Sequence, residues 1–302
     1  MSALPSVRTK ASPRRRRQAM IGAAYIAPSF ILMMIFNVVP IFLSIYFSFT
    51  KYNMAAPPQW IGLDNYAKLF SNRVLTEALR NTVKYVLITV PVQTVLSLLI
   101  AAFIAERMKN RYGSLMRSII FIPVIVSLIA SATVWNIMYQ PKGGLINQFL
   151  NLLGFDSVNF LGKKANALPA VAVVAIWKNT GYYMVIYYAG VMNVPPDVRE
   201  AAIVDGATPV QRFWYITLPI LKPITYMIVT LGIIGSFQVF DLVYKMTGGG
   251  PGRSTYTVAY VIYTFAFQDK NYGYASAVAI CLLIVILLIH MVQTLLFKEK
   301  DA

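Results

Sequence analysis

The sequence predicts an all-α, polytopic membrane protein in which six transmembrane helices form one domain and both termini lie in the cytoplasm. Hydrophobic residues make up 58% of the 302-residue chain and charged residues only 13%, whereas about a quarter of the residues in soluble proteins are charged. The apolar residues gather in runs long enough to cross a bilayer, which takes about 20 helical residues.

Six such runs are expected to span the membrane. Prolines lie inside the first three, and neighbouring helices in a bilayer can satisfy the carbonyls that a proline frees. The first run contains Pro28 and Pro40, so a kinked or tilted helix is expected there. The predicted spans are 21–49, 82–105, 118–139, 168–192, 224–244 and 274–297.

Basic residues suggest the orientation of the domain, residues 21–297. Residues 1–20 carry Arg8, Lys10 and the run Arg14–Arg17. Because this cluster abuts a span, it predicts a cytoplasmic anchor rather than a nucleic-acid site. The first run exceeds the apolar region of a signal peptide, about 7–15 residues, so we expect an uncleaved span. Residues 298–302 then form a second cytoplasmic tail.

Three segments are expected on the outer side. The residues Trp60, Leu63, Tyr66, Leu69 and Phe70 recur at helical spacing, which predicts an amphipathic helix over 60–70. This helix could lie on the outer membrane interface or pack as an extracellular helix, and the sequence leaves both open. Segments 140–167 and 245–273 are predicted as loops with turns.

A polar loop, 193–223, separates the fourth and fifth spans. Asp197 is expected at the N-cap of a short helix over 198–204, and Gly206 is expected to end it in the left-handed conformation. A second helix is expected over 209–215.

Small residues give this loop its pattern. Ala201 and Ala202 are expected on one face, where another backbone could approach closely, and Leu218-Pro219 is expected to turn the chain toward the fifth span. A loop of this kind predicts a compact knob that docks a partner at the membrane surface.

The pattern Glu200-Ala201-Ala202, Gly206, Ile216 and Leu218-Pro219 resembles the EAA loop of permease subunits of bacterial ABC importers of the binding-protein-dependent type I class. The stretches Thr247–Pro251 and Trp60–Tyr66 are similar to those of the carbohydrate-uptake branch, in the style of maltose and glycerol-phosphate permeases. The resemblance runs from roughly residue 20 to 297.

The resemblance implies a type I permease fold with six spans and a coupling helix that docks on a cytoplasmic ATPase. Glu200 would hold the loop by a charge-assisted contact, and Ala201, Ala202 and Gly206 would form the close-approach surface. The implied docking residues are Glu200, Ala201, Ala202, Asp205, Gly206, Ile216, Leu218 and Pro219.

The resemblance also implies the partners: a second homologous permease in a heterodimer, two ATPase subunits, an extracytoplasmic solute-binding protein, a sugar and the bilayer of a bacterial plasma membrane. ATP and Mg²⁺ would bind to the partner ATPase, and no cofactor is expected on this chain. Nucleic acid is not an expected partner.

No catalytic or metal-binding motif is found in the sequence. The stretch Gly248–Thr255 looks superficially like a phosphate-binding loop, but it lacks the required glycine spacing and lysine. A single Cys281 excludes an intrachain disulfide, and the lone His290 is expected to be a packed or interfacial side chain. The chain is therefore expected to be non-catalytic.

Polar and aromatic residues inside the spans are candidates for a sugar pathway, because sugars present hydroxyl groups and an apolar face. The alternative is an aromatic belt or hydrogen bonding between helices. Lys178 could pair with Asp241 or extend toward the interface. The candidates are Trp135, Asn136, Lys178, Asn179, Tyr182, Tyr183, Tyr187, Phe237, Gln238 and Asp241.

The predicted function is a permease subunit that forms half of the pathway for a di- or oligosaccharide and receives work from ATP hydrolysis through the EAA loop. The alternative is a stand-alone secondary transporter or channel for a small polar solute. A secondary transporter would be indicated by an inverted repeat with broken helices or by an acidic relay within the spans. The sequence shows neither feature.

Overall fold

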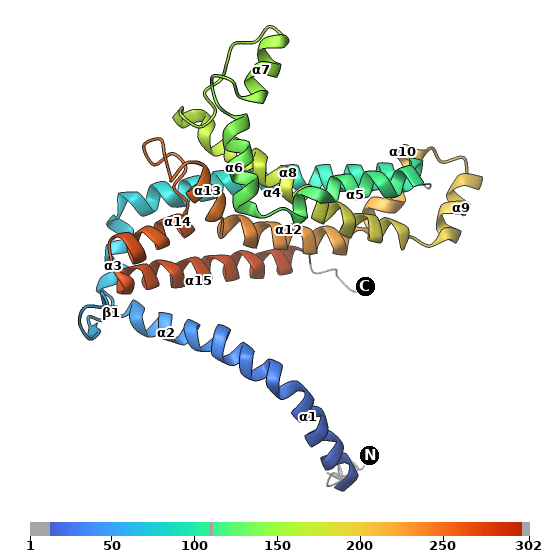
Figure 1. The fold of residues 1–302 in the computed structure, drawn as a ribbon. Coiled ribbons are helices and arrows are strands. Elements are labelled where there is room, and N and C mark those ends of the chain that lie inside the picture. The colour runs from blue at the N-terminus through green and yellow to red at the C-terminus, as the bar shows by residue number, and fades with distance from the viewer. Residues whose placement is uncertain (1–12, 109–110, 298–302) are drawn as a thin grey trace.

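The computed structural model describes residues 13–108 and 111–297, and the described chain is a helical bundle with one two-stranded hairpin (Figure 1). The predicted tail residues Arg8 and Lys10 and the predicted tail 298–302 lie outside the described residues. The α-helices are α1 (Pro13–Met33), α2 (Val39–Ser48), α3 (Asp64–Ser71), α4 (Arg73–Arg107), α5 (Arg111–Ile125), α6 (Leu128–Met138), α7 (Leu145–Leu152), α8 (Lys164–Met192), α9 (Pro196–Val204), α10 (Pro209–Arg212), α11 (Leu218–Ile220), α12 (Lys222–Phe237), α13 (Asp241–Met246), α14 (Val258–Tyr263) and α15 (Tyr272–Phe297). The strands β1 (Thr50–Lys51) and β2 (Gln59–Trp60) pair antiparallel, and the π-helical turns are η1 (Met34–Val38), η2 (Phe213–Thr217) and η3 (Thr264–Gln268).

The pair α4 and α8 forms the centre of the bundle, with α5 against α8 and α12 against α4 (Figure 1). Small residues let the central helices approach: Ala101 of α4 and Ala172 of α8 are fully buried. Two apolar clusters follow this contact, one around Tyr85 and Val171 and the other around Ile104. The bundle is therefore built on close helix packing, as small residues favour in membranes.

The first span is a long helical segment that leaves the bundle. Residues Met20–Ser48 form it, and α1 stands apart from the other helices while α2 packs on α15 (Figure 1). The predicted bend coincides with η1, directly before Pro40. Because Pro40 lacks an N–H for the regular helical bond, the widened π turn accommodates it.

The second span begins earlier than predicted. α4 starts at Arg73 rather than near residue 82, because the Asn72 side chain caps it by accepting hydrogen bonds from the amides of Val74 at 2.9 Å and Leu75 at 3.3 Å. With 35 residues, α4 is about 52 Å long at 1.5 Å per residue. It therefore reaches beyond the apolar run on which the prediction rested.

The third predicted span is broken. α5 and α6 are bent by 97° at a break where Ser127 takes an extended conformation (φ −52°, ψ 137°). α6 packs against α13 and carries the chain away from the bundle toward α7 (Figure 1). The run predicted as one span over 118–139 therefore consists of parts of two helices, because apolarity reflects contact with the membrane and not the straightness of a helix.

The six predicted spans have unequal apolarity in the structure. Three described helices are long and apolar enough to cross a membrane, and two bent pairs raise the number to five if each pair is one span. α8 is not among them, yet it is a 29-residue helix at the centre of the bundle with 15 buried residues. A helix surrounded by other helices contacts little lipid, so it tolerates a polar composition.

Helices also occur in segments predicted as loops. The segment 140–167 contains α7, and 245–273 contains α14 and η3. The helix expected over 60–70 begins only at Asp64, because Trp60 pairs with Thr50 in the hairpin. In α3, Leu69 packs against α14 and α15, which corresponds to the packed alternative, while Phe70 stays 92% exposed.

Gly181 sets the distance between α5 and α8. A Cβ atom at this position would collide with the backbone carbonyl of Ile120 on α5. We predict that Gly181→Ala lowers stability by about 1–3 kcal/mol, since an added methyl group forces the helices apart. Thermal unfolding in detergent, followed by tryptophan fluorescence, measures this. Gly22→Ala, where nothing lies within 4 Å of the added atom, is the matched control and should leave the midpoint unchanged.

Candidate functional site

The polar loop forms two short helices, as predicted, but the first of them begins at a different residue. Pro195 rather than Asp197 occupies the N-cap of α9, and Asp197 lies in its first turn, where its charge complements the helix dipole. Gly206 ends the helix with φ +77°. The amide of Ala207 donates to the Ala202 carbonyl at 2.9 Å, and that of Gly206 to the Ile203 carbonyl at 3.0 Å. These two bonds form a Schellman motif, so the C-cap prediction is confirmed.

The second half of the loop is a longer helix than predicted. Thr208 and Gln211 form a reciprocal capping box at the start of α10, and the helix continues through η2 and α11. The chain therefore does not turn at Leu218-Pro219. It bends by 68° at Leu221, which is fully buried, before α12 begins. The π turn η2 precedes Pro219 and accommodates the missing N–H.

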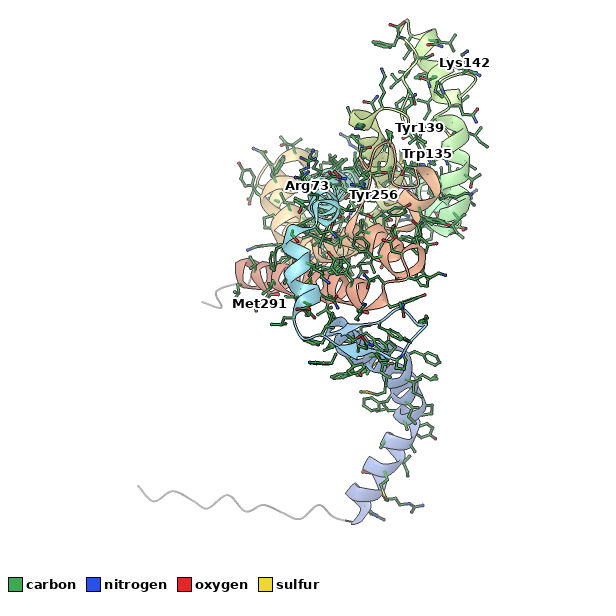
Figure 2. The ribbon with its side chains drawn as sticks, turned by 90° about the vertical axis from the view of Figure 1, so that its left-hand side faces the viewer. Arg73, Trp135, Tyr139, Lys142, Tyr256 and Met291 are labelled. Carbon is green, nitrogen blue, oxygen red and sulfur yellow. The ribbon has the colours of Figure 1, made fainter. Side chains whose placement is uncertain are left out.

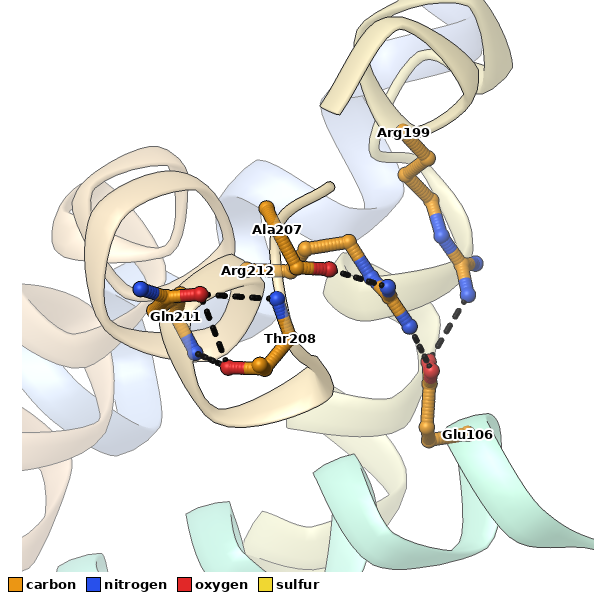
Figure 3. A network of polar contacts seen from close by, with 6 residues as sticks. All are labelled: Glu106, Arg199, Ala207, Thr208, Gln211 and Arg212. Carbon is orange, nitrogen blue, oxygen red and sulfur yellow. Dashed lines mark hydrogen bonds and ion pairs between the residues drawn. The ribbon is translucent and has the colours of Figure 1, made fainter. Parts of the chain in front are cut away.

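A carboxylate clamp, Glu106 with Arg199 and Arg212, fastens this loop to the end of α4 (Figure 3). Arg199 Nη2 lies 2.9 Å from Glu106 Oε2, and Arg212 Nη2 lies 2.5 Å from Oε1. Arg212 also donates to the Ala207 carbonyl at 2.9 Å. The three side chains are only 16–34% exposed, so solvent screens these pairs less than it screens surface pairs. One carboxylate thus holds both helices of the loop.

The predicted docking residues divide into exposed and inward-facing groups. Glu200, Ala201, Asp205, Gly206 and Pro219 are exposed. Ala202 is 9% exposed and turns toward the chain itself, while Ile216 and Leu218 are half-buried. Ala201 and Ala202 therefore lie on different faces of α9, because consecutive helical residues are rotated by about 100°.

The charge-assisted contacts that hold the loop on α4 come from Arg199 and Arg212, which the sequence-based prediction missed. The Glu200 side chain makes no hydrogen bond or ion pair within the described part of the chain, so its carboxylate is available to a partner. Glu106 and Arg212 are 106 positions apart. Spacing alone could not have paired them.

Removing the clamp carboxylate tests its role. Glu106→Gln leaves two guanidinium groups without their counterion, a cost of about 1–3 kcal/mol. We expect the loop to loosen, which would be seen as faster hydrogen exchange in α9 and α10. Glu77→Gln, on the same helix α4 and far from the loop in sequence, is the control and should leave the exchange there unchanged. Unaltered exchange in Glu106→Gln would contradict the clamp.

A central cavity of about 410 Å³ lies among α4, α8, α12 and α13. It collects six of the predicted pathway residues from segments more than 50 positions apart. These are Lys178, Asn179, Tyr182 and Tyr183 on α8, with Gln238 and Asp241 between α12 and α13. Its wall thus combines aromatic rings, amides and a carboxylate, a set of groups that suits a hydroxyl-rich solute.

The other four candidates are not among the residues lining this cavity. Tyr187 is fully buried and its hydroxyl donates to Thr225 at 3.1 Å, and Phe237 is 4% exposed. Asn136 donates to the Lys245 carbonyl at 3.2 Å, and Trp135 packs on Tyr139 and Trp177. Along the projecting segment, Trp135 and Tyr139 lie nearer the bundle than Lys142 does (Figure 2).

Lys178 caps the broken third span instead of pairing with Asp241. Its Nζ donates to the carbonyls of Pro123 at 2.9 Å and Val126 at 2.6 Å, with Val124 at 3.5 Å. These carbonyls belong to the end of α5, where the break removes their helical partners. A cation at a helix C-terminus is also favoured by the helix dipole. Lys178 therefore fixes the break and lines the cavity at once.

Polar residues of α4 behind the cavity escaped the sequence-based prediction. Thr89, Gln93 and Ser97 recur every four residues and form a buried stripe. Thr89 bonds Ser236 at 3.0 Å, Asn179 donates to Gln93 Oε1 at 3.3 Å, and Ser97 donates to the Thr180 carbonyl at 3.1 Å. The spacing of four was the available signal, since it places polar groups on one helix face.

Replacement of Lys178 tests whether this side chain caps the break between α5 and α6 or serves only as a ligand in the cavity. Lys178→Met leaves the carbonyls of the break without this donor, at a total cost of about 1–3 kcal/mol, because the contacts are only partly buried. We expect a lower unfolding midpoint, and recovery of most of the loss in Lys178→Arg, which retains donors and charge. An unchanged midpoint in Lys178→Met would rule out the cap.

A membrane-embedded bundle around a polar cavity, with a clamped loop at one end, defines a polytopic transport subunit. The chain belongs to the binding-protein-dependent transport system inner membrane component family, whose model matches residues 61–300. The resemblance of the EAA loop and its context to this class is thereby confirmed, and the chain is a permease subunit of the ABC importer type.

Relatives align along nearly the whole chain. The probable ABC transporter permease protein YurN of Bacillus subtilis is 32% identical over 282 residues, covering 92% of this chain and 96% of the relative. The trehalose/maltose transport system permease protein MalF of Thermococcus litoralis is 33% identical over 277 residues, covering 91% and 93%.

A solved structure supports the fold. A chain of a bacterial ABC transporter involved in the import of the acidic polysaccharide alginate superposes with a TM-score of 0.84 at 24% identity, covering 96% of this chain and 99% of that chain. The type I permease fold predicted from the sequence is thus the fold of the chain.

Proposed function

We propose that this chain forms half of the translocation pathway of an ATP-driven sugar importer in a bacterial plasma membrane. Its partners would be a second homologous permease, two cytoplasmic ATPases that bind ATP and Mg²⁺, and a solute-binding protein outside. Both termini would be cytoplasmic. Support for a sugar comes from the cavity and from relatives named as permeases for trehalose/maltose, arabinooligosaccharides and lactose.

The observation that carries the proposal is the path from the loop to the cavity. The clamp joins α9 and α10 to α4, and α4 supplies Tyr85 to the cavity wall and Gln93 behind it. An ATPase that moved the loop would therefore move a helix of the cavity. Glu200, Ala201, Asp205 and Gly206 would meet the ATPase, whereas Ala202, Ile216 and Leu218 would hold the loop against the bundle.

In the cavity, sugar hydroxyl groups would bond the amides of Asn179 and Gln238 and the carboxylate of Asp241. The rings of Tyr182 and Tyr183 would cover an apolar face of the sugar. Closure of the ATPases on ATP would swing the paired permeases from inward- to outward-facing, and the binding protein would deliver its sugar to the opened cavity.

Substitution at Gly206 tests the coupling. Its φ of +77° disfavours any side chain, and the residue is exposed on the predicted docking face. In the purified complex, Gly206→Asp should reduce retention of the ATPase and abolish binding-protein-stimulated ATP hydrolysis. Gly143→Asp, also at positive φ (+81°) but between α6 and α7, is the matched control and should keep both. Full stimulation in Gly206→Asp, or uptake driven by an ion gradient without ATP, would overturn the proposal.

A further inference from the structure

A second and larger cavity, of about 650 Å³, lies at the end of the bundle opposite the coupling loop. It is formed by the first turns of α4, the start of α8 and the glycine-rich loop 247–256, and its volume is within the usual range of ligand sites, about 300–1,000 Å³. It shares no lining residue with the central cavity.

Positive charge dominates this cavity. Arg80, Lys84, Lys164 and Arg253 line it, against a single carboxylate, that of Glu77. Within the described residues, none of these four cationic groups has a carboxylate oxygen within 4.0 Å. Like charges gathered in one concave site repel one another, so an anion bound among them would be favoured.

The loop on one side of the cavity is held rigidly. Asn81 of α4 donates to the carbonyls of Arg253 at 3.0 Å and Tyr256 at 3.1 Å. Thr255 bonds Thr247 at 2.7 Å and donates to the Gly250 carbonyl at 2.9 Å. These bonds fix the backbone at Arg253, so little backbone order has to be gained when a ligand binds.

Gly252 brings this loop against α8. A Cβ atom there would lie 2.6 Å from Lys164 Cε and 3.0 Å from Lys164 Nζ, so glycine, which also suits the φ of +54°, lets the lysine side chain lie in this position. The Oγ of Ser254, which also lines the cavity, is buried without a hydrogen-bond partner. Buried hydroxyl groups normally have a partner, so this oxygen has unused bonding capacity.

The apolar part of the lining consists of Leu87, Ile88, Ala165, Leu168 and Pro169. Cations, a free hydroxyl and an apolar wall match a ligand that carries an acidic group, hydroxyl groups and an apolar ring face. Together they match a saccharide that bears a carboxylate better than a bare inorganic ion, which would use only the cations.

We infer that this basic cavity is an entry site for acidic saccharides, in which Arg80, Lys84, Lys164 and Arg253 hold a carboxylate of the cargo before it reaches the central cavity. This inference rests on the proposed function as a sugar permease, and it specifies acidic saccharides as the class of sugar transported. Anionic lipid headgroups offer similar oxygens, so the experiment separates them from the saccharide.

The test places a reporter thiol in the cavity of the complete importer in nanodiscs. Cys281→Ser removes the native thiol, and Ala165→Cys, an exposed lining position, supplies the reporter. An anionic methanethiosulfonate should label it at least about tenfold faster than a cationic one, relative to the same ratio at Leu152→Cys on α7. Lys84→Gln with Arg253→Gln should remove this preference, and Lys84→Arg should keep it.

Protection by cargo completes the test. Trigalacturonate should slow labelling of the reporter several-fold, whereas its methyl ester, with the same ring skeleton and no charge, should not. Equal protection by both, or no protection by either, would overturn the inference. Slowing by phosphatidylglycerol in the nanodisc but not by trigalacturonate would assign the cavity to lipid and also overturn it. Binding-protein-stimulated ATP hydrolysis in the same nanodiscs reports on the proposed function independently of these outcomes.

Discussion

Backbone groups that leave a helix inside a bilayer must find partners within the protein, because lipid offers none. The break between α5 and α6 exposes the carbonyls of Pro123 and Val126, and Lys178 supplies the donors. One ammonium group therefore makes the 97° bend possible, and α6 can then leave the bundle and pack on α13. Leu128, the first residue of α6, also lines the central cavity beside α8, α12 and α13.

At the polar loop, too, one charged side chain binds several partners. A single carboxylate, Glu106, binds guanidinium groups from α9 and α10, so two short helices without a large apolar core are fastened to the end of α4. Buried charges are costly unless paired, and the half-buried position of this clamp keeps that cost low while limiting screening by salt. α4 thus connects the loop, which it holds through Glu106, with the central cavity, which it lines through Tyr85.

The sequence predicted the features that depend on local chemistry. Gly206 was placed at the C-cap because only glycine takes φ +77° without strain, and the structure has a Schellman motif there. Six of ten pathway candidates line one cavity, because polar groups in spans avoid lipid. Other candidates do not line this cavity: the Tyr187 hydroxyl donates to Thr225, and Asn136 donates to a backbone carbonyl. Both are polar and inside spans, yet neighbouring helices, not a cavity, supply their partners.

By itself, the sequence determined the class of the protein and the two short helices of the polar loop, since these follow from apolarity and from residues with special backbone preferences. The tertiary structure alone decided the break at Ser127, the pairing of Glu106 with Arg212, and the joining of Arg80, Lys84, Lys164 and Arg253 in one cavity. Each of these brings together groups far apart in the chain. Their partners are set by helix packing, which residue spacing along a single segment does not encode.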